Sequence, residues 1–399
     1  MHELEFRKYP YPYQSMLAIC SDLDETRTAH DYFSIGEFLN TDHRTPIGTG
    51  IGLEVGNTIY FDMPGEQFAY WNTDSEARSK IHALIRSGHI DCFHSYGDLA
   101  KTREDAARSL GALEKNNCML SVWVDHARAP TNFGPGIMFG QGDVAKSPAF
   151  HADLTANHGV KYVWTGRVTS MIGQNTKYRL FDMSNGQHPV LSTRTAAKDY
   201  AKKLLASATG SRYRMHYKNK LIRKVELRSG QSLLEFMRCN PHPRGVSAGD
   251  NSRGIAEVLT TRYLDRLVDS AGSAILYTHL GKQVVPGRIF ERKTVEAFEL
   301  LAAYARDGRT LVTTTKKLLD YAAVQSVLNC EVQHKHGLNV VQIRTPADSS
   351  VDGITFYWDM PRPQVFVNGS LCTNFRTNSA DESGRRSISL PWKKLEWGL

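Results

Sequence analysis

The chain has 399 residues, of which 41% are hydrophobic and 23% charged, the balance of an ordinary globular protein. No apolar run is long enough to cross a membrane, so no membrane-spanning helix is expected. The net charge of +8 suits an anionic partner such as an acidic polysaccharide or a nucleic acid. The basic residues are spread out, however, and no nucleic-acid-binding motif occurs, so we predict no nucleic-acid partner.

The first eight residues lack the apolar core of a signal peptide. If this is the native start, a cytoplasmic location is expected; if a leader was removed, a secreted or periplasmic location stays open. The six cysteines include no Cys-x-x-Cys pair, so a cysteine zinc site is not expected. The densest basic segment, residues 212–224, alternates like an exposed edge strand.

Strands and helices alternate along the first 327 residues. Strands are expected at 16–22, 89–93, 119–124, 161–164, 232–237, 273–279 and 310–312. Helices are expected at 75–87, 102–115, 147–158, 195–206, 255–270, 292–305 and 316–323. The glycine-rich segment 48–61 favours a β-hairpin. The pattern predicts an α/β fold, a distorted barrel of seven or eight βα units, with a doubly wound sheet as the alternative.

After residue 328 the pattern changes to short strands at 340–343, 354–358 and 364–367. We therefore predict two domains: a barrel over 1–327 and a small β module over 328–399 that packs on it.

Two acids follow the first strand, which ends in the apolar run 16–20. Because side chains alternate along a strand, Asp22 and Asp24 should point the same way. Like charges at one strand end favour a divalent cation between them. The structural alternative is that one of them caps a following helix.

Other strands also end in polar residues. His94 and Asp98 follow the strand at 89–93, and a helical turn there would place both on one face, at a spacing that suits zinc. A satisfied core histidine and a helix cap are the alternative reading. Asp125 and His126 follow the strand at 119–124, and His126 could be a further metal ligand or contact substrate. His279 ends the strand at 273–279, where its pKa near neutrality suits a general acid.

In a parallel barrel such strand ends gather at one face. Their order resembles that of the polysaccharide deacetylase superfamily, the NodB-like or carbohydrate esterase family 4 group. That family has a Thr-Phe-Asp-Asp motif, a His-[Ser/Thr]-x-x-His motif and a late Leu-x-His motif. The counterparts here are Ser21-Asp22-Leu23-Asp24, His94-Ser95-Tyr96-Gly97-Asp98 and Leu276-Tyr277-Thr278-His279. The acids are not adjacent, Asp98 replaces a histidine, and the last motif is one residue longer.

The resemblance implies a metal-dependent hydrolase that removes acetyl groups from a poly- or oligosaccharide. Asp24, His94 and Asp98 would then hold a divalent metal, with zinc as the expected ion, while Asp22 would be the general base; Asp22 and Asp24 could exchange these roles. His279 would protonate the leaving group. A metal-dependent mannosidase-like glycoside hydrolase and an inactive carbohydrate-binding protein remain alternatives.

Four further residues are candidate substrate contacts at the strand ends: Asp125, His126, Trp164 and Arg238. Trp164 could stack on a sugar ring, although core packing explains it equally well. Arg238 could instead orient a carboxylate of the site.

Overall fold

The computed structural model describes residues 4–399 apart from residue 137, most of 178–217, and residues 284–286, 336–337, 347–348 and 362. The helix expected over 195–206 falls largely outside the described residues. In the basic segment 212–224, residues 212–215 and 217 also lie outside the described residues.

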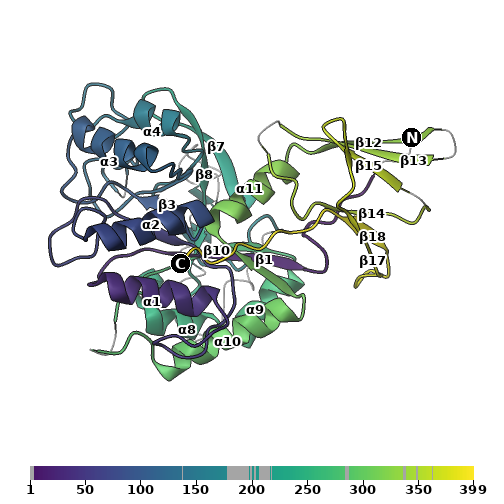
Figure 1. The fold of residues 1–399 in the computed structure, drawn as a ribbon, viewed down its shortest axis with the longest axis horizontal. Coiled ribbons are helices and arrows are strands. Elements are labelled where there is room, and N and C mark those ends of the chain that lie inside the picture. The colour runs from purple at the N-terminus through teal and green to yellow at the C-terminus, as the bar shows by residue number, and fades with distance from the viewer. Residues whose placement is uncertain are drawn as a thin grey trace.

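One curled sheet organises the larger part of the molecule (Figure 1). Its strands are β1 (Ser15–Ser21), β2 (Asn57–Ile59), β3 (Ile90–His94), β4 (Val122–Val124), β5 (Tyr162–Trp164), β6 (Val168–Thr169), β7 (Ile222–Glu226), β8 (Ser232–Phe236), β9 (Arg238–Cys239), β10 (Ser273–Thr278) and β11 (Thr310–Thr313). They lie in the order β6-β9-β10-β1-β2-β3-β4-β5-β8-β7, with β11 also beside β1. All neighbours are parallel except β7 and β8.

The sheet curls because one short segment contacts both of its halves. β8 pairs with β5, whereas β9, which follows after Met237, pairs with β10 on the other half. The α/β class is therefore confirmed. The hydrogen-bonded strands form a curled, half-open sheet, in which seven or eight regular βα units are not evident.

Helices cover the outside of the sheet (Figure 1). They are α1 (Ala29–Asn40), α2 (Ser75–Ser87), α3 (Arg103–Lys115), α4 (Ala152–His158), α7 (Val246–Gly249), α8 (Ser252–Val258), α9 (Thr261–Asp269), α10 (Arg292–Arg306) and α11 (Thr315–Gln325). Helix α2 has the expected bounds, because Asp74 caps its first turn and Gly88 ends it in the left-handed conformation. No helix among the described residues is both long and apolar enough to span a membrane.

Two expectations about local structure were wrong. The helix expected over 255–270 is two helices, α8 and α9, because the Thr260 side chain accepts the backbone N–H of Tyr263 and starts a new helix. The glycine-rich segment forms no hairpin; its end becomes the parallel strand β2. Gly56 is needed there for close packing, since a Cβ would lie 2.4 Å from Oδ1 of Asp91.

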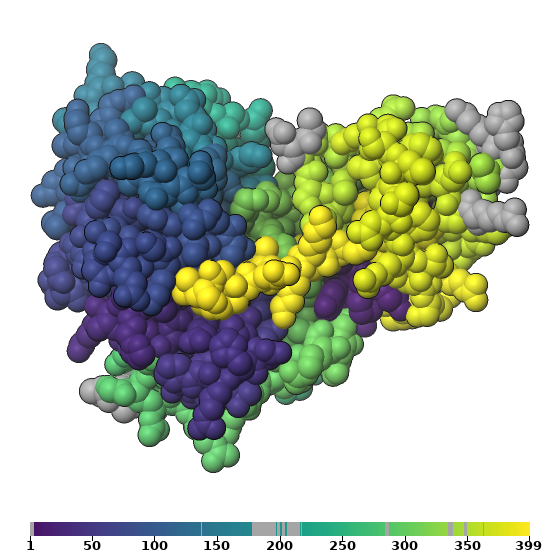
Figure 2. All heavy atoms as spheres, in the orientation of Figure 1, coloured from purple at the N-terminus to yellow at the C-terminus, as the bar shows by residue number. Residues whose placement is uncertain are grey.

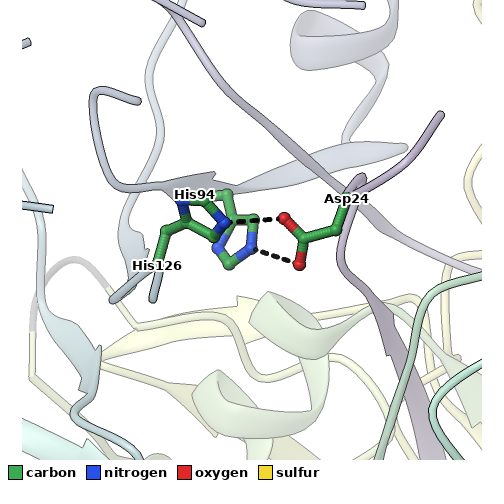
Figure 3. Close-up of side chains that lie close together, drawn as sticks. All are labelled: Asp24, His94 and His126. Atoms are coloured by element: carbon green, nitrogen blue, oxygen red, sulfur yellow. Dashed lines mark hydrogen bonds and ion pairs between the residues drawn. The ribbon is translucent and has the colours of Figure 1, made fainter. Parts of the chain in front are cut away.

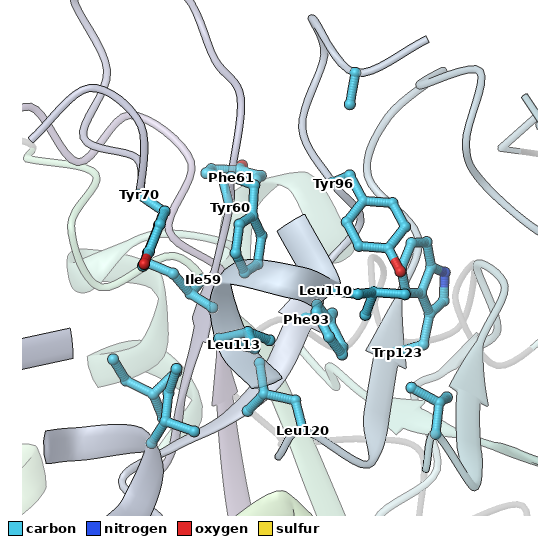
Figure 4. Close-up of a cluster of buried hydrophobic side chains, with 14 of the residues drawn as sticks. Ile59, Tyr60, Phe61, Tyr70, Phe93, Tyr96, Leu110, Leu113, Leu120 and Trp123 are labelled. Carbon is cyan, nitrogen blue, oxygen red and sulfur yellow. The ribbon is translucent and has the colours of Figure 1, made fainter. Parts of the chain in front are cut away.

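Aromatic side chains fill much of the core between the sheet and helices α2 and α3. Figure 4 shows Phe61, Phe93, Tyr96 and Trp123 in this cluster, all fully buried. Phe93 and Trp123 leave β3 and β4 on this side, so the next residues along these strands, His94 and Val124, face the other side of the sheet. The alternation thus turns His94 toward the concave interior.

The C-terminal part consists of two small sheets at the right of Figure 1. One contains β12 (Asn329–Lys335), β13 (Leu338–Arg344), β15 (Pro363–Val367) and β16 (Ser370–Cys372); the other contains β14 (Thr355–Tyr357), β17 (Arg376–Asn378) and β18 (Ser387–Ser389). The strands expected beyond residue 328 are thus present.

The two chain ends cross between the larger part and these small sheets. Near the N-terminus, the backbone N–H of Arg7 donates to the carbonyl of Thr355 at 2.8 Å. The C-terminal residues return across the larger part, as the yellow segment in Figure 2 shows. There the ring of Trp397 lies 4.9 Å from that of His89. Each end therefore stabilises the part of the molecule that is remote from it in sequence.

Candidate metal centre

Residues from three strand ends converge at one edge of the curled sheet. Asp24, His94 and His126 each offer a ligand atom, and these atoms lie within 4.8 Å of one another (Figure 3). A second group, which shares Asp24, adds Asp22 and His279. The convergence expected of Asp22, Asp24, His94 and His279 is therefore present, with His126 as an additional member.

The chain turns sharply after each of the three residues in Figure 3. Glu25, Ser95 and Ala127 follow Asp24, His94 and His126, and their φ angles are 63°, 51° and 41°. Residues other than glycine rarely adopt this left-handed conformation, and they concentrate at functional sites. The strained turns allow the chain to leave the sheet immediately while each side chain stays over its edge.

Asp24 is at the centre of the cluster. Its Oδ2 lies 2.5 Å from Nε2 of His279 and 3.5 Å from Nε2 of His94. Its Oδ1 lies 2.8 Å from Nε2 of His126, yet this buried oxygen has no hydrogen bond of acceptable geometry within the described chain. The histidine nitrogens thus surround the carboxylate closely, and they satisfy Oδ2 but leave Oδ1 without a hydrogen bond.

The cluster holds positive charge strongly. Burial alone would raise the pKa of Asp24, but the charge of His94 and the contacts with His126 and His279 outweigh it and keep that pKa well below its usual value. Burial also opposes a charge on His126, yet Asp24 and Asp98 raise its pKa to about 10. The arrangement therefore favours cations, either protons on the histidines or a metal ion in their place.

Asp22 has a different environment from Asp24. It is buried, and Arg238 donates to both of its oxygens, at 2.6 and 2.8 Å. The guanidinium lies against the rings of Trp164, 4.2 Å from the centroid, and Tyr277, 5.2 Å away, and these two rings stack with their centroids 5.9 Å apart. Arg238 thus orients Asp22, and Trp164 packs against Arg238, which matches the alternative reading of both residues rather than a direct substrate contact.

His279 has a defined tautomer. Its Nδ1 lies 2.7 Å from the backbone carbonyl of Asp250, which can only accept, so Nδ1 carries a proton. Burial lowers the pKa of His279, but Asp24 and Asp22 outweigh this and raise it. Nε2 therefore faces the cluster and can carry the second proton.

Asp98 is not in either group of metal-ligand atoms. The expectation that it would join His94 rested on a helical turn, whereas Ser95 and Gly97 both have positive φ and α3 begins only at Arg103. Gly97 is required in this turn, since a Cβ would lie 2.2 Å from the carbonyl oxygen of Asp62. The Asp98 carboxylate consequently forms an ion pair with Nδ1 of His126, at 2.9 Å, although this nitrogen makes no hydrogen bond of acceptable geometry within the described residues.

Asp125 lies under the site rather than in it. It is fully buried and accepts from Nε1 of Trp123 and from the backbone N–H groups of Phe133 and Gly134, at 2.8 to 2.9 Å. Burial raises its pKa to about 7. Asp125 thus anchors the loop that follows His126, and no surface is left for a substrate contact.

Two neighbours of the histidines were missed in the sequence. The fully buried ring of Tyr60 stacks on His94, with centroids 4.8 Å apart, and its hydroxyl has no partner among the residues the structure describes. The Asn132 side chain accepts the backbone N–H of His126 and donates to its carbonyl, both at 2.9 Å. Tyr60 directly follows β2. The other site residues were found because they follow predicted strands, and Tyr60 was missed because β2 was not predicted as one of these strands.

The residues at the site fit a divalent metal. Two imidazoles and a carboxylate form a three-ligand set typical of catalytic zinc. Asp24 Oδ1 and the Nδ1 atom of His94 are buried without a hydrogen-bond partner in the described part of the chain. Asp98 on the far nitrogen of His126 resembles the carboxylate that commonly supports a metal-bound histidine.

Comparison with known proteins identifies no relative: no protein-family model matches the chain, and neither a curated protein nor a solved structure is significantly similar to it. We therefore infer the function from the geometry of the site alone.

Proposed function

We propose that this protein is a metal-dependent hydrolase that removes acetyl groups from an acetylated poly- or oligosaccharide, as a divergent member of the polysaccharide deacetylase superfamily. The observation that carries the proposal is the cluster of Asp24, His94 and His126 beside Asp22 and His279. The curled sheet supports it, since β8 and β9 link its two halves as a distorted barrel requires.

Asp24, His94 and His126 would hold the metal, and their ligand types favour zinc. A divalent metal at this position would supply Lewis-acid polarisation of an acyl carbonyl and lower the pKa of a bound water. Asp98 would keep His126 in the orientation that presents Nε2 to the cluster.

The roles of the two acids follow from their partners. Asp24 contacts three histidines and belongs to both groups of ligand atoms, which suits a metal ligand. Asp22 is held in place by hydrogen bonds from both terminal nitrogens of Arg238, and its Oδ2 lies 3.6 Å from Nε2 of His94. It would therefore accept the proton of the attacking water as general base.

His279 would donate a proton to the leaving amine or alcohol. The carbonyl of Asp250 fixes its Nδ1 proton, so the proton available for transfer sits on Nε2, which faces Asp24. Hydrolysis then balances: water adds to the acyl carbon, Asp22 receives one proton, and His279 returns one to the departing sugar group.

Acetate release from acetylated oligosaccharides tests this function. We expect acetate from the zinc-loaded wild-type protein, and a fall in kcat of about 10²–10⁴ in Asp22→Asn, the range of a lost general base. Metal content and circular dichroism of this variant must match the wild type. Asp62→Asn, which removes a surface partner of Arg108, is the matched control and should retain activity.

Two outcomes would reject the deacetylase proposal. Release of free sugar without acetate would identify a glycoside hydrolase. Metal-loaded protein that binds acetylated oligosaccharides but releases neither product would indicate a carbohydrate-binding protein.

A further inference from the structure

The two histidines of the candidate metal centre differ in what supports the ring nitrogen that points away from Asp24. His126 presents Nε2 to Asp24, and the Asp98 carboxylate forms an ion pair with its Nδ1 at 2.9 Å. His94 also presents Nε2 to Asp24, but its Nδ1 is buried and has no hydrogen-bond partner among the described residues. Metal-binding histidines are normally oriented by a polar partner at this far nitrogen. For His94, another contact must therefore fix the ring.

The ring of Tyr60 makes such a contact with both histidines. It stacks on the His94 ring with an angle of 23° between the planes and the centroids 4.8 Å apart. The same ring meets the His126 ring edge to face, at 4.9 Å and 65°. The two imidazoles are 4.8 Å from each other, so the three rings form a closed triangle of contacts. A change at Tyr60 would consequently affect both proposed metal ligands.

The register of the sheet produces the stack between Tyr60 and His94. Ile59 pairs with Phe93 in the parallel ladder of β2 and β3, so the residues that follow them, Tyr60 and His94, lie side by side. Neighbouring strands are about 4.8 Å apart, which matches the separation of the two ring centroids. The carbonyl of Tyr60 also accepts the N–H of Tyr70 at 3.0 Å. The backbone of Tyr60 is thus fixed on both sides of the strand end.

The contact depends on the aromatic ring of Tyr60 and not on its hydroxyl. Tyr60 is fully buried, and its hydroxyl has no hydrogen-bond partner among the residues the structure describes, which include both imidazoles. Stacked and edge-to-face rings attract each other beyond the effect of burial alone. An imidazole that binds a cation is electron-poor, and the electron-rich face of a phenol ring suits it. A phenylalanine at this position should therefore provide the same support.

We propose that Tyr60 is a positioning residue, whose ring holds His94 and His126 in the orientation that binds a metal ion. For His94, the stacked ring takes the place of the polar partner that Asp98 provides for His126. The inference rests on the metal centre of the proposed function, but it does not depend on the removal of acetyl groups.

Zinc affinity of the full chain, measured by competition with a chromogenic chelator, tests this role. Tyr60→Leu should bind zinc at least about tenfold more weakly than the wild type, the loss typical of a group that supports a metal-bound histidine. Tyr60→Phe keeps the ring and should bind zinc like the wild type. Visible absorption of the cobalt-loaded proteins reports the ligand geometry, and its bands should change in Tyr60→Leu but not in Tyr60→Phe.

Phe61→Leu is the matched control for the loss of a buried aromatic side chain. Phe61 is the next residue along the chain and is also fully buried, but its ring packs on Phe93 and Tyr96, with centroids 5.9 and 6.2 Å away (Figure 4). This variant should keep the zinc affinity of the wild type. Circular dichroism checks that each variant is folded. If Tyr60→Leu does not fold, Tyr60→Met takes its place, because methionine adapts to irregular space in a core.

Three results would overturn the proposal. One is Tyr60→Leu or Tyr60→Met with the zinc affinity and the cobalt spectrum of the wild type. Another is an equal loss of affinity in Tyr60→Leu and Phe61→Leu, which would indicate only a loosened core. The last is an equal loss in Tyr60→Phe and Tyr60→Leu, which would assign the role to the hydroxyl. Wild-type protein that binds no zinc would reject the metal centre itself, whereas zinc binding without acetate release would reject only the hydrolase function.

Discussion

Two buried charge clusters in the larger part of the molecule differ in how well their atoms are satisfied. The Glu54 carboxylate has a partner for each oxygen: the Thr313 hydroxyl and Lys317 ammonium contact Oε1, and the backbone N–H of Leu395 donates to Oε2 at 2.6 Å. In the candidate metal centre, by contrast, His94 Nδ1 is buried without a hydrogen-bond partner in the described chain, and Asp24 Oδ1 has an ion pair with His126 Nε2 but no hydrogen bond.

The difference separates structural from functional charge. A buried carboxylate whose oxygens are all bonded stabilises the fold, and here it also fixes the returning C-terminal segment to the larger part. A buried cluster that keeps unpaired atoms costs stability unless something else binds it. The following predictions test this contrast.

The largest effect on stability is expected at the pair inside the site. Arg238→Leu should lower the free energy of unfolding by about 3–5 kcal/mol, because it leaves the buried Asp22 carboxylate without its partner. Urea denaturation measures the change. Arg238→Leu/Asp22→Leu removes both charges and should regain most of the loss; a double variant no more stable than the single one would contradict this explanation.

A slightly smaller loss is expected at the satisfied cluster. Glu54→Ala should reduce the free energy of unfolding by about 2–4 kcal/mol, since it leaves Lys317 and the N–H of Leu395 unpaired. Thermal or urea unfolding detects this. Glu76→Ala removes an exposed carboxylate paired with Lys80 and should change stability by about 0.5 kcal/mol at most. Equal losses of unfolding free energy in Glu54→Ala and Glu76→Ala would show that the buried carboxylate stabilises the fold no more than the exposed one.

Asp98 should affect metal affinity without abolishing it. Asp98→Asn removes the charge beside Nδ1 of His126, and we expect zinc to bind about 10–100-fold more weakly, as for other groups that support a metal-bound histidine. Competition with a chromogenic chelator gives the affinity. Complete loss of zinc would show that Asp98 is itself a ligand, as the sequence motif implied, and unchanged affinity would show that it does not support His126.

The smallest effect concerns Asp91, whose pKa burial raises to about 6. The folded protein binds this proton more tightly than the unfolded chain, so the contribution of Asp91 to stability is fully present below about pH 4 and is lost as pH rises through 6. Asp91→Asn cannot ionise and can still accept from the N–H of Lys316. Its stability relative to the wild type should rise by about 1 kcal/mol between pH 5 and 7. Urea denaturation of both proteins at pH 5 and pH 7 measures this. The same difference in unfolding free energy between variant and wild type at both pH values would contradict the prediction.

Much of the site could be predicted because its residues follow apolar strands. Asp22, Asp24, His94 and His279 each stand at or after a strand's carboxyl end, and parallel strands bring these ends together. Helix α2 could be bounded closely because its capping residues are local in sequence.

The remaining features depend on contacts that local patterns do not encode. The choice between Asp98 and His126 is set by positive φ angles at Ser95 and Gly97, of which only the glycine is visible in the sequence. The pairing of Asp22 with Arg238 spans 216 residues, and the crossing of the chain ends depends on tertiary packing. Periodicity identified many of the strands, but it missed β2, β6 and β9 and could not identify the partners that the side chains would meet.

Elemental analysis of the protein after zinc reconstitution and dialysis tests whether Asp24, His94 and His126 hold a metal ion. We expect about one zinc per wild-type chain, and its loss in both His94→Ala and His126→Ala. His43→Ala, which replaces an exposed histidine, should keep the metal. Wild-type protein that retains no metal, or full zinc in both site variants, would contradict the assignment of Asp24, His94 and His126 as a metal centre.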